Sequence, residues 1–196
     1  MEFEFSEGKI SFSKELSDID RFVLRFVEIL NSLHIKYIIV SGYVPILFGR
    51  SRSTEDIDMF IEDIGKNKFD ELSEKEEKAG LWILNTSDRA MAFQMLKEDE
   101  AIRIAKEKQA IPNIEMKINR DERVWKDTIE VVVNKSSIIT SRIESQIAFK
   151  LYLGSEKDIE DAVYLYELFK DKLDMKTLAE RCKALNVLEA MNTYVR

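Results

Sequence analysis

"SGYVPILFGRSRSTEDIDMF", residues 41–60, begins with a turn-forming Ser-Gly pair and ends with two aspartates that are two positions apart. Polar and apolar residues alternate after Thr54, which predicts a β-strand with one polar face. Because successive side chains of a strand point to opposite faces, we expect Asp56 and Asp58 on the same face. Neighbouring carboxylates repel each other unless a cation lies between them, and such oxygen ligands suit Mg²⁺. The stretch therefore indicates a metal site, against the alternative of a solvated strand face.

The residues around this acidic pair favour a phosphate site beside it. The β-branched run "IKYIIV" at 35–40 predicts a buried strand, which Ser41 and Gly42 end before a short helix. A glycine there lets backbone N–H groups approach a phosphate closely. Arg52 and Thr54 come just before the aspartates and add a positive charge and a hydroxyl to the same region. The alternative for Gly42 is a residue that only ends a strand.

The remaining elements are expected to form a mixed α/β part followed by helices. Apolar residues at a period of 3.6 predict helices, and β-branched runs predict strands. The predicted helices are 16–33, 44–48, 66–79, 87–96, 141–153, 155–170 and 174–185, and the later predicted strands are 101–105, 113–119 and 128–133. Ser87 and Ser155 are N-cap candidates, and Ser141 with Glu144 matches a capping box. Residues 81–84 are ambiguous between helix and strand.

Composition limits the class of protein. The chain has 196 residues, 45% of them hydrophobic, which suits one domain with a sizeable core. The net charge of −7 argues against a broad DNA-binding surface, although residues 101–126 could form a local basic rim. Cys182 and His34 are the only residues of their types, which excludes a disulfide within the chain and a His-rich metal site. With no long apolar run and an acidic N-terminal stretch, we expect a cytoplasmic protein without membrane contact.

Residues 40–62, "VSGYVPILFGRSRSTEDIDMFIE", resemble the core signature of the nucleotidyltransferase superfamily related to DNA polymerase beta. That signature is a hydrophobic strand, a Gly-Ser or Gly-Gly turn, a helix, and Asp-hydrophobic-Asp on the next strand. Its R-x-T-x-D-I-D form is typical of small prokaryotic branches, including abortive-infection toxins and minimal nucleotidyltransferases. The segment 143–167 is similar to their downstream helices. The resemblance implies an α+β fold, with a small mixed β-sheet and flanking helices over 1–140 and a C-terminal helical part over 141–196.

The resemblance also implies a reaction and its cofactor. Family members move an NMP from an NTP to an acceptor hydroxyl by a two-metal mechanism. Asp56 and Asp58 would hold two Mg²⁺ ions, or Mn²⁺ in their place. Glu115 faces away from its apolar neighbours in "NIEMKI" and would be the third carboxylate ligand, with an exposed strand carboxylate as the alternative. The implied acceptor is an RNA such as tRNA, or a protein.

The remaining site residues follow from the same resemblance. Tyr43 stands where the family turn carries Gly or Ser, so it would either select a nucleotide or mark a site that has lost transfer. Lys150 would contact phosphate, with a helix C-terminal cation as its alternative. Asp161 would line the site or order the helical tail. The implied nucleotide-binding residues are Ser41, Gly42, Tyr43, Arg52, Thr54, Lys150 and Asp161.

Two other functions stay open at this point. The first is a catalytically weak or inactive nucleotide-binding component of a toxin–antitoxin pair, which would act through a partner protein. The identity of Tyr43 favours it, and the intact Asp56, Asp58 and Glu115 disfavour it. The second is a metal-dependent phosphohydrolase, because paired carboxylates serve that chemistry too.

Overall fold

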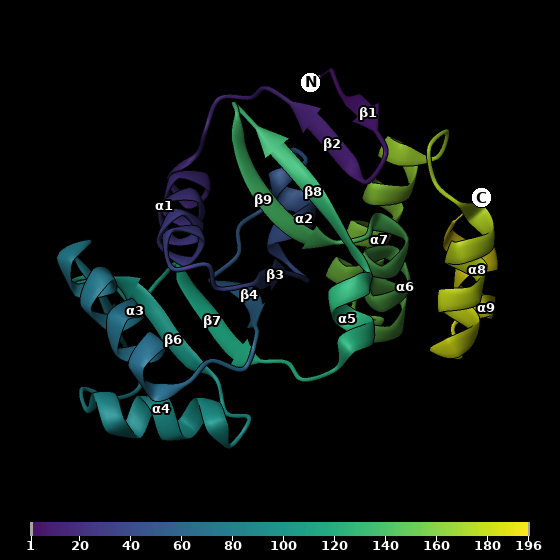
Figure 1. Ribbon diagram of the computed structural model, residues 1–196. Helices are drawn as coiled ribbons and strands as arrows, with labels where there is room; N and C mark the ends of the chain where they lie inside the picture. The colour runs from purple at the N-terminus through teal and green to yellow at the C-terminus, as the bar shows by residue number, and fades with distance from the viewer. Residues whose placement is uncertain (1, 196) are drawn as a thin grey trace.

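The computed structural model describes residues 2–195, and within them nine strands form one mixed sheet (Figure 1). The strands are β1 (Glu4–Ser6), β2 (Lys9–Phe12), β3 (Tyr37–Ile39), β4 (Asp56–Ile61), β5 (Leu81–Ile83), β6 (Ile102–Lys106), β7 (Asn113–Ile118), β8 (Thr128–Val133) and β9 (Ser136–Ser141). Their order across the sheet is β1-β2-β8-β9-β3-β4-β7-β6-β5. The strand that carries the acidic pair, β4, thus lies near the middle of the sheet.

The helices are α1 (Asp18–Ser32), α2 (Tyr43–Leu47), α3 (Lys66–Lys78), α4 (Arg89–Lys97), α5 (Glu122–Lys126), α6 (Ile143–Leu153), α7 (Glu156–Phe169), α8 (Met175–Ala184) and α9 (Leu188–Tyr194). Figure 1 shows two groups of them, with α1, α3 and α4 on the left and α6 to α9 on the right. Helix α6 packs against both α7 and α8. The mixed sheet with flanking helices and a helical C-terminal part confirms the predicted fold class, although the sheet is larger than expected.

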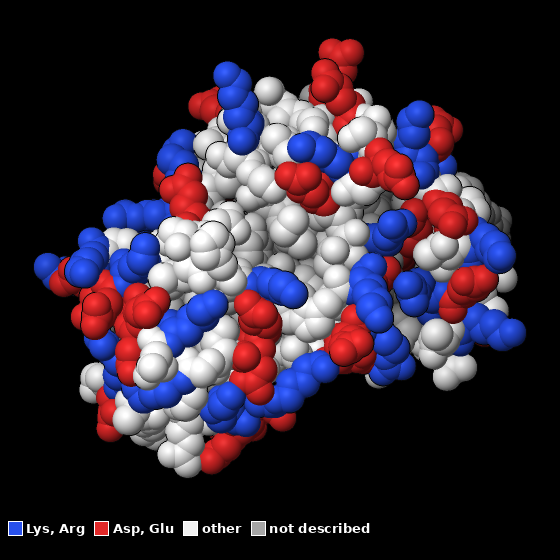
Figure 2. All heavy atoms as spheres, viewed as in Figure 1, with Lys and Arg blue, Asp and Glu red and all other residues white. Residues whose placement is uncertain are grey.

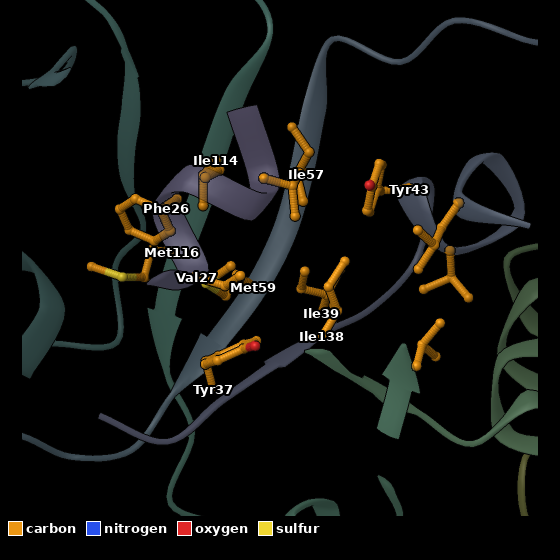
Figure 3. Packing of buried hydrophobic residues seen from close by; sticks show 14 of the residues in the cluster. Phe26, Val27, Tyr37, Ile39, Tyr43, Ile57, Met59, Ile114, Met116 and Ile138 are labelled. Carbon is orange, nitrogen blue, oxygen red and sulfur yellow. The ribbon is translucent and has the colours of Figure 1, made fainter. Parts of the chain in front are cut away.

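The hydrophobic core lies between α1 and the middle strands. Ile57 and Met59 of β4 are buried, as the alternating pattern predicts. Figure 3 shows them beside Phe26 and Val27 of α1 and beside Ile114 of β7. Full burial of one such side chain contributes about 1.5–3 kcal/mol. Core packing therefore fixes which face of β4 turns inward and leaves the aspartates on the other face.

Helix boundaries depend on capping groups, and three of these groups were predicted. Ser155 caps α7 by accepting the N–H of Asp158, which confirms that prediction. The prediction for Ser87 is wrong, because Asp88 caps α4 and a carboxylate accepts two backbone N–H groups there. The capping box at Ser141 is wrong as well, because Ser141 ends β9 and α6 starts after Arg142 without a side-chain cap.

The division of the chain into two parts stays a prediction. Its outer limits are residues 1 and 196, which lie outside the described residues. The last strand ends at Ser141 and α6 begins at Ile143, close to the expected boundary. Between residues 2 and 195, no helix is both long and apolar enough to cross a bilayer.

Candidate active site

The acidic pair lies on the partly exposed face of β4. Asp56 and Asp58 share this face as predicted, and Glu115 lies directly opposite Asp58 because β4 and β7 run parallel in that register. Burial raises the pKa of Asp58, and the nearby charges of Asp56 and Glu115 raise it further, against a hydrogen bond from Ser41 that lowers it. Asp58 therefore lies where a negative charge is already unfavourable.

Glu115 is held by two cations on its own side of this cluster. Its carboxylate oxygens lie 2.8 Å from Lys117 Nζ and 3.0 Å from an Arg103 guanidinium nitrogen. The hydrogen bond from Lys117, reinforced by Arg103, keeps the pKa of Glu115 below its ordinary value. As the side chains stand, no three His, Cys, Asp or Glu residues within 2–195 form a group that could hold a metal ion. Glu115 would have to turn away from these cations to join the aspartates.

The chemistry of the donor set nevertheless fits a hard divalent cation. Asp56 and Asp58 offer carboxylate oxygens on one strand face, and Mg²⁺ is commonly held by one or two carboxylates together with phosphate oxygens. A cation beside Asp58 would relieve the repulsion that raises its pKa. The two aspartates could therefore supply a first set of ligands, and Glu115 would join them only after leaving Arg103 and Lys117.

The turn between β3 and α2 is shaped by contacts with distant residues. Ser41 has a left-handed backbone, with φ of 62°, and its N–H donates to Gln146 Oε1 at 3.1 Å. A Cβ on Gly42 would come within 3.3 Å of an Arg52 nitrogen and 3.4 Å of Thr54 Oγ1, so this close approach favours glycine. Arg52 also donates to the Gly42 carbonyl at 2.9 Å. Both turn residues are thus fixed by side chains from elsewhere in the chain.

A buried ionic network lies behind this turn. Arg52 makes a two-pronged contact with Asp161, at 2.9 and 2.7 Å, and Lys150 Nζ lies 3.0 Å from the same carboxylate and 2.7 Å from that of Asp158. Arg50 contacts Asp161 at 2.7 Å. Burial opposes ionisation of Asp161, but hydrogen bonds from Arg52 and Lys150 outweigh it and keep its pKa low. Through these ion pairs Lys150 of α6 and Asp161 of α7 are connected to Arg52, which donates to the Gly42 carbonyl of the turn.

These contacts change what three of the predicted residues can do. Lys150 is only 2% exposed and is paired with two aspartates, so the expectation that it contacts phosphate is corrected. Asp161 is fully buried and contacts Arg52 and Lys150, and ordering of the helical tail stays a prediction for it. The Arg52 nitrogens contact Asp161 and two backbone carbonyls, so Arg52 supports the turn from behind.

The Tyr43 side chain points into the hydrophobic core and away from solvent. Its side chain is fully buried, and its hydroxyl donates to Asp20 at 2.8 Å (Figure 3 shows its ring within the core). Asp20 is itself buried and paired with Lys14 at 2.9 Å. The expectation that Tyr43 selects a nucleotide is therefore corrected. A large aromatic residue at the start of α2 serves packing, and the bound carboxylate satisfies its hydroxyl.

Side chains that sequence reasoning passed over include Gln146, Arg50, Lys14 and Asp20. Gln146 and Arg50 lie inside the two segments that carry the family resemblance, so the segments were found but these positions were not singled out. Lys14 and Asp20 precede the signature and show no sequence pattern that would connect them to Tyr43. Only the fold brings them beneath α2.

Acidic and basic side chains are interspersed over the face in Figure 2, and uncharged residues line a hollow near its centre. The basic residues expected to form a rim are largely paired with acidic ones. Arg120 contacts Asp63 at 2.9 Å, and Lys126 lies 3.7 Å from Glu122. These pairs compensate much of the positive charge of 101–126.

Solved structures of known proteins share this fold. No family model matches the chain, and no curated protein matches it. An antigenic nucleotidyltransferase-like protein from Paracoccidioides brasiliensis is 17% identical, with a TM-score of 0.51 over 92% of this chain and 94% of that one. The antibiotic-resistance factor ANT(2'')-Ia is 13% identical, with a TM-score of 0.55 over 90% and 97%. The lincosamide antibiotic adenylyltransferase LnuA, bound to lincomycin, is 15% identical, with a TM-score of 0.51 over 78% and 98%. The chain therefore has the nucleotidyltransferase fold.

Proposed function

We propose that this protein is a Mg²⁺-dependent nucleotidyltransferase that moves an NMP from an NTP to an acceptor hydroxyl. The observation that carries the proposal is the placement of Asp56 and Asp58 on one face of β4, with Ser41 beside Asp58, in a chain with the nucleotidyltransferase fold. The neighbouring solved structures are named for nucleotidyl or adenylyl transfer, which supports the same reaction class.

In the proposed reaction the acceptor oxygen bonds to the α-phosphorus, and the bond from the α-phosphorus to the oxygen between the α- and β-phosphates breaks. Pyrophosphate leaves with that oxygen, and the hydroxyl proton goes to a carboxylate or water. Asp56 and Asp58 would hold Mg²⁺, and Glu115 would join them. The bound ions would neutralise developing phosphate charge and favour deprotonation of the acceptor. The Ser41 hydroxyl and the Gly42 backbone N–H would receive the distal phosphates, while Gln146 and Arg52 hold the turn in place. Protein catalysis would then rest on positioning and charge.

The acceptor class is the least constrained part of the proposal. The family resemblance suggests an RNA or a protein. Among the neighbouring structures, ANT(2'')-Ia has been solved with adenylyl-2''-tobramycin and LnuA with lincomycin, so a small hydroxylated acceptor is a third candidate. The interspersed surface charge disfavours a long nucleic-acid track but permits a short RNA end at the site.

The reaction is tested by incubating the protein and Mg²⁺ with each NTP, labelled either at the α- or at the γ-phosphate, and with cell lysate. Nucleotidyl transfer predicts α-label in RNA, protein or a small molecule, and γ-label only in pyrophosphate. Release of γ-label as orthophosphate, with no α-label transferred, would indicate the phosphohydrolase alternative and overturn the proposal.

The second candidate is a nucleotide-binding protein with little or no transfer. It is favoured by one observation, the tight hold of Arg103 and Lys117 on Glu115, because a carboxylate so paired is not free to serve as a ligand. Substitution of both cations by Met should release Glu115. If transfer appears only in this variant, the wild-type chain is a binding protein. If transfer is already present in the wild type, the pairing is only the state of the site without substrate.

A further inference from the structure

A cavity of about 480 Å³ lies between α3, β5 and the start of α4, away from the acidic pair. Ile83 of β5 lines it. Ile83 pairs with Ile104, which pairs with Ile114, and Ile114 precedes Glu115 on β7. Because side chains alternate along each strand, Ile83 is on the sheet face opposite Glu115. The cavity is therefore separated from the proposed active site by the sheet itself.

Two polar side chains on the buried face of α3 line this cavity. Ser73 and Glu76 are three residues apart, so they lie on the same side of the helix. They are 3% and 2% exposed. Within residues 2–195, neither Ser73 Oγ nor Glu76 Oε1 has a hydrogen-bond partner. A buried polar group without a partner costs about 1–3 kcal/mol, so two adjacent ones in a cavity point to a ligand that pairs with both.

The charge at the cavity selects the kind of ligand. Arg89 at the mouth pairs with Glu77 at 2.8 Å, so these two opposite charges compensate each other. Among the described residues, the Glu76 carboxyl remains without a cationic partner. An anion would keep this carboxyl in its neutral, protonated form and gain no ion pair there, and a purely apolar ligand would leave both polar atoms unpaired. A primary ammonium carries a positive charge and three N–H donors, which suit a carboxylate and a hydroxyl oxygen.

We propose that this cavity binds a small protonated primary amine, whose ammonium group lies between the Glu76 carboxylate and the Ser73 hydroxyl. The carbon part of the ligand would lie along Leu81 and Ile83, which line the same cavity and share one face of β5. The volume is within the range of small-molecule sites, which run from about 300 to 1,000 Å³.

The protonation of Glu76 agrees with this assignment and supplies a second readout. Burial raises its pKa to about 8 and Glu77 adds to the shift, while Arg89 opposes it. Without a cation the carboxyl is largely protonated at neutral pH, and an ammonium beside it would lower its pKa. Amine binding should therefore release a proton from Glu76 to the buffer. Titration calorimetry in two buffers of different ionisation enthalpy measures that proton.

The test is titration of the full chain with propylammonium, followed by amide chemical shifts, with 1-propanol as the neutral control. The expected result is saturable shifts in α3 and β5 with the amine alone, and a loss of affinity of at least about tenfold in Glu76→Leu. Glu71→Gln, which changes an exposed carboxylate of the same helix that does not line the cavity, is the matched control and should bind the amine. Ser73→Ala, a smaller change, should also weaken binding and covers the case in which Glu76→Leu does not fold.

Three results would overturn the assignment. They are the absence of saturable shifts with propylammonium, equal shifts with 1-propanol, and unchanged amine affinity in folded Glu76→Leu or Ser73→Ala. Because the cavity and Glu115 are on opposite faces of the sheet, none of these results bears on nucleotidyl transfer, and failure of one proposal leaves the other standing.

Discussion

Replacing Lys150 by Met removes the positive charge at the centre of the network that connects α6 and α7 to the Ser-Gly turn. Asp158 and Asp161 would both lose the Lys150 ammonium, which lies 2.7 and 3.0 Å from their carboxylates. The lost contacts are buried, because Lys150 is only 2% exposed. Breaking a buried ion pair by removing one partner costs about 3–5 kcal/mol. Asp161 keeps Arg52 and Arg50, so we expect the lower end, about 3 kcal/mol.

Urea unfolding measures this loss. With a slope of about 3 kcal/mol per M, a loss of about 3 kcal/mol lowers the midpoint by roughly 1 M. Lys170→Met is the matched control, since its pair with Glu167 is exposed, and its midpoint should stay unchanged. Adding Asp158→Leu to Lys150→Met should restore part of the stability, because both members of one pair are then gone. A midpoint for Lys150→Met equal to that of the wild type would refute a structural role for the network.

Three further changes test the structure elsewhere. Tyr43→Phe removes one hydrogen-bond donor to the buried Asp20 carboxylate, so the free energy of unfolding in urea should fall by about 1–3 kcal/mol. Nucleotide affinity should not change. A changed affinity in the folded variant would show that Tyr43 contributes to nucleotide binding. Ser17→Ala removes the N-cap of α1 and should cost about 1 kcal/mol; an unchanged midpoint would contradict the cap. In the folded protein the pKa of Glu76 is raised from 4.5 to about 8, so the native state binds more protons than the unfolded state between these two pH values. The free energy of unfolding should therefore fall as the pH rises from 4.5 to about 8. Glu76→Gln should flatten this slope, and equal slopes for variant and wild type would disprove the raised pKa.

The alternating pattern of β4 predicted the place of the acidic pair correctly. It sufficed because side-chain alternation is a property of any strand, and burial of Ile57 and Met59 decides which face is polar. The resemblance of residues 40–62 predicted the fold class, which the neighbouring structures confirm. Both inferences used local patterns of short range.

The partners of buried charges were not predictable in the same way. Arg52 and Asp161 are 109 positions apart, and Tyr43 and Asp20 are 23 apart, so their contacts depend on how helices pack. A sequence shows that Lys150 is a cation near a helix end, but not that two aspartates of the next helix enclose it. Arg52, Lys150 and Asp161, which the resemblance placed at the nucleotide, instead contact one another inside the fold.

The short N-terminal strands were also missed. β1 and β2 are three and four residues long, and the apolar alternation in Lys9–Phe12 is too brief to stand out. β2 becomes a strand because it pairs in parallel with β8, more than a hundred residues later in the chain. Its formation depends on that long-range pairing.

The most direct test of the account is NTP affinity, measured with and without Mg²⁺, for the wild type and for the Asp56→Asn/Asp58→Asn double variant. Asp18→Asn/Asp171→Asn, which changes two exposed aspartates, controls for the loss of charge. We predict that Mg²⁺ strengthens NTP binding in the wild type and in the control, and has no effect in the folded Asp56/Asp58 variant. Unchanged Mg²⁺-dependent affinity in that variant would contradict the claim that these two carboxylates and the Ser-Gly turn form one metal and phosphate site.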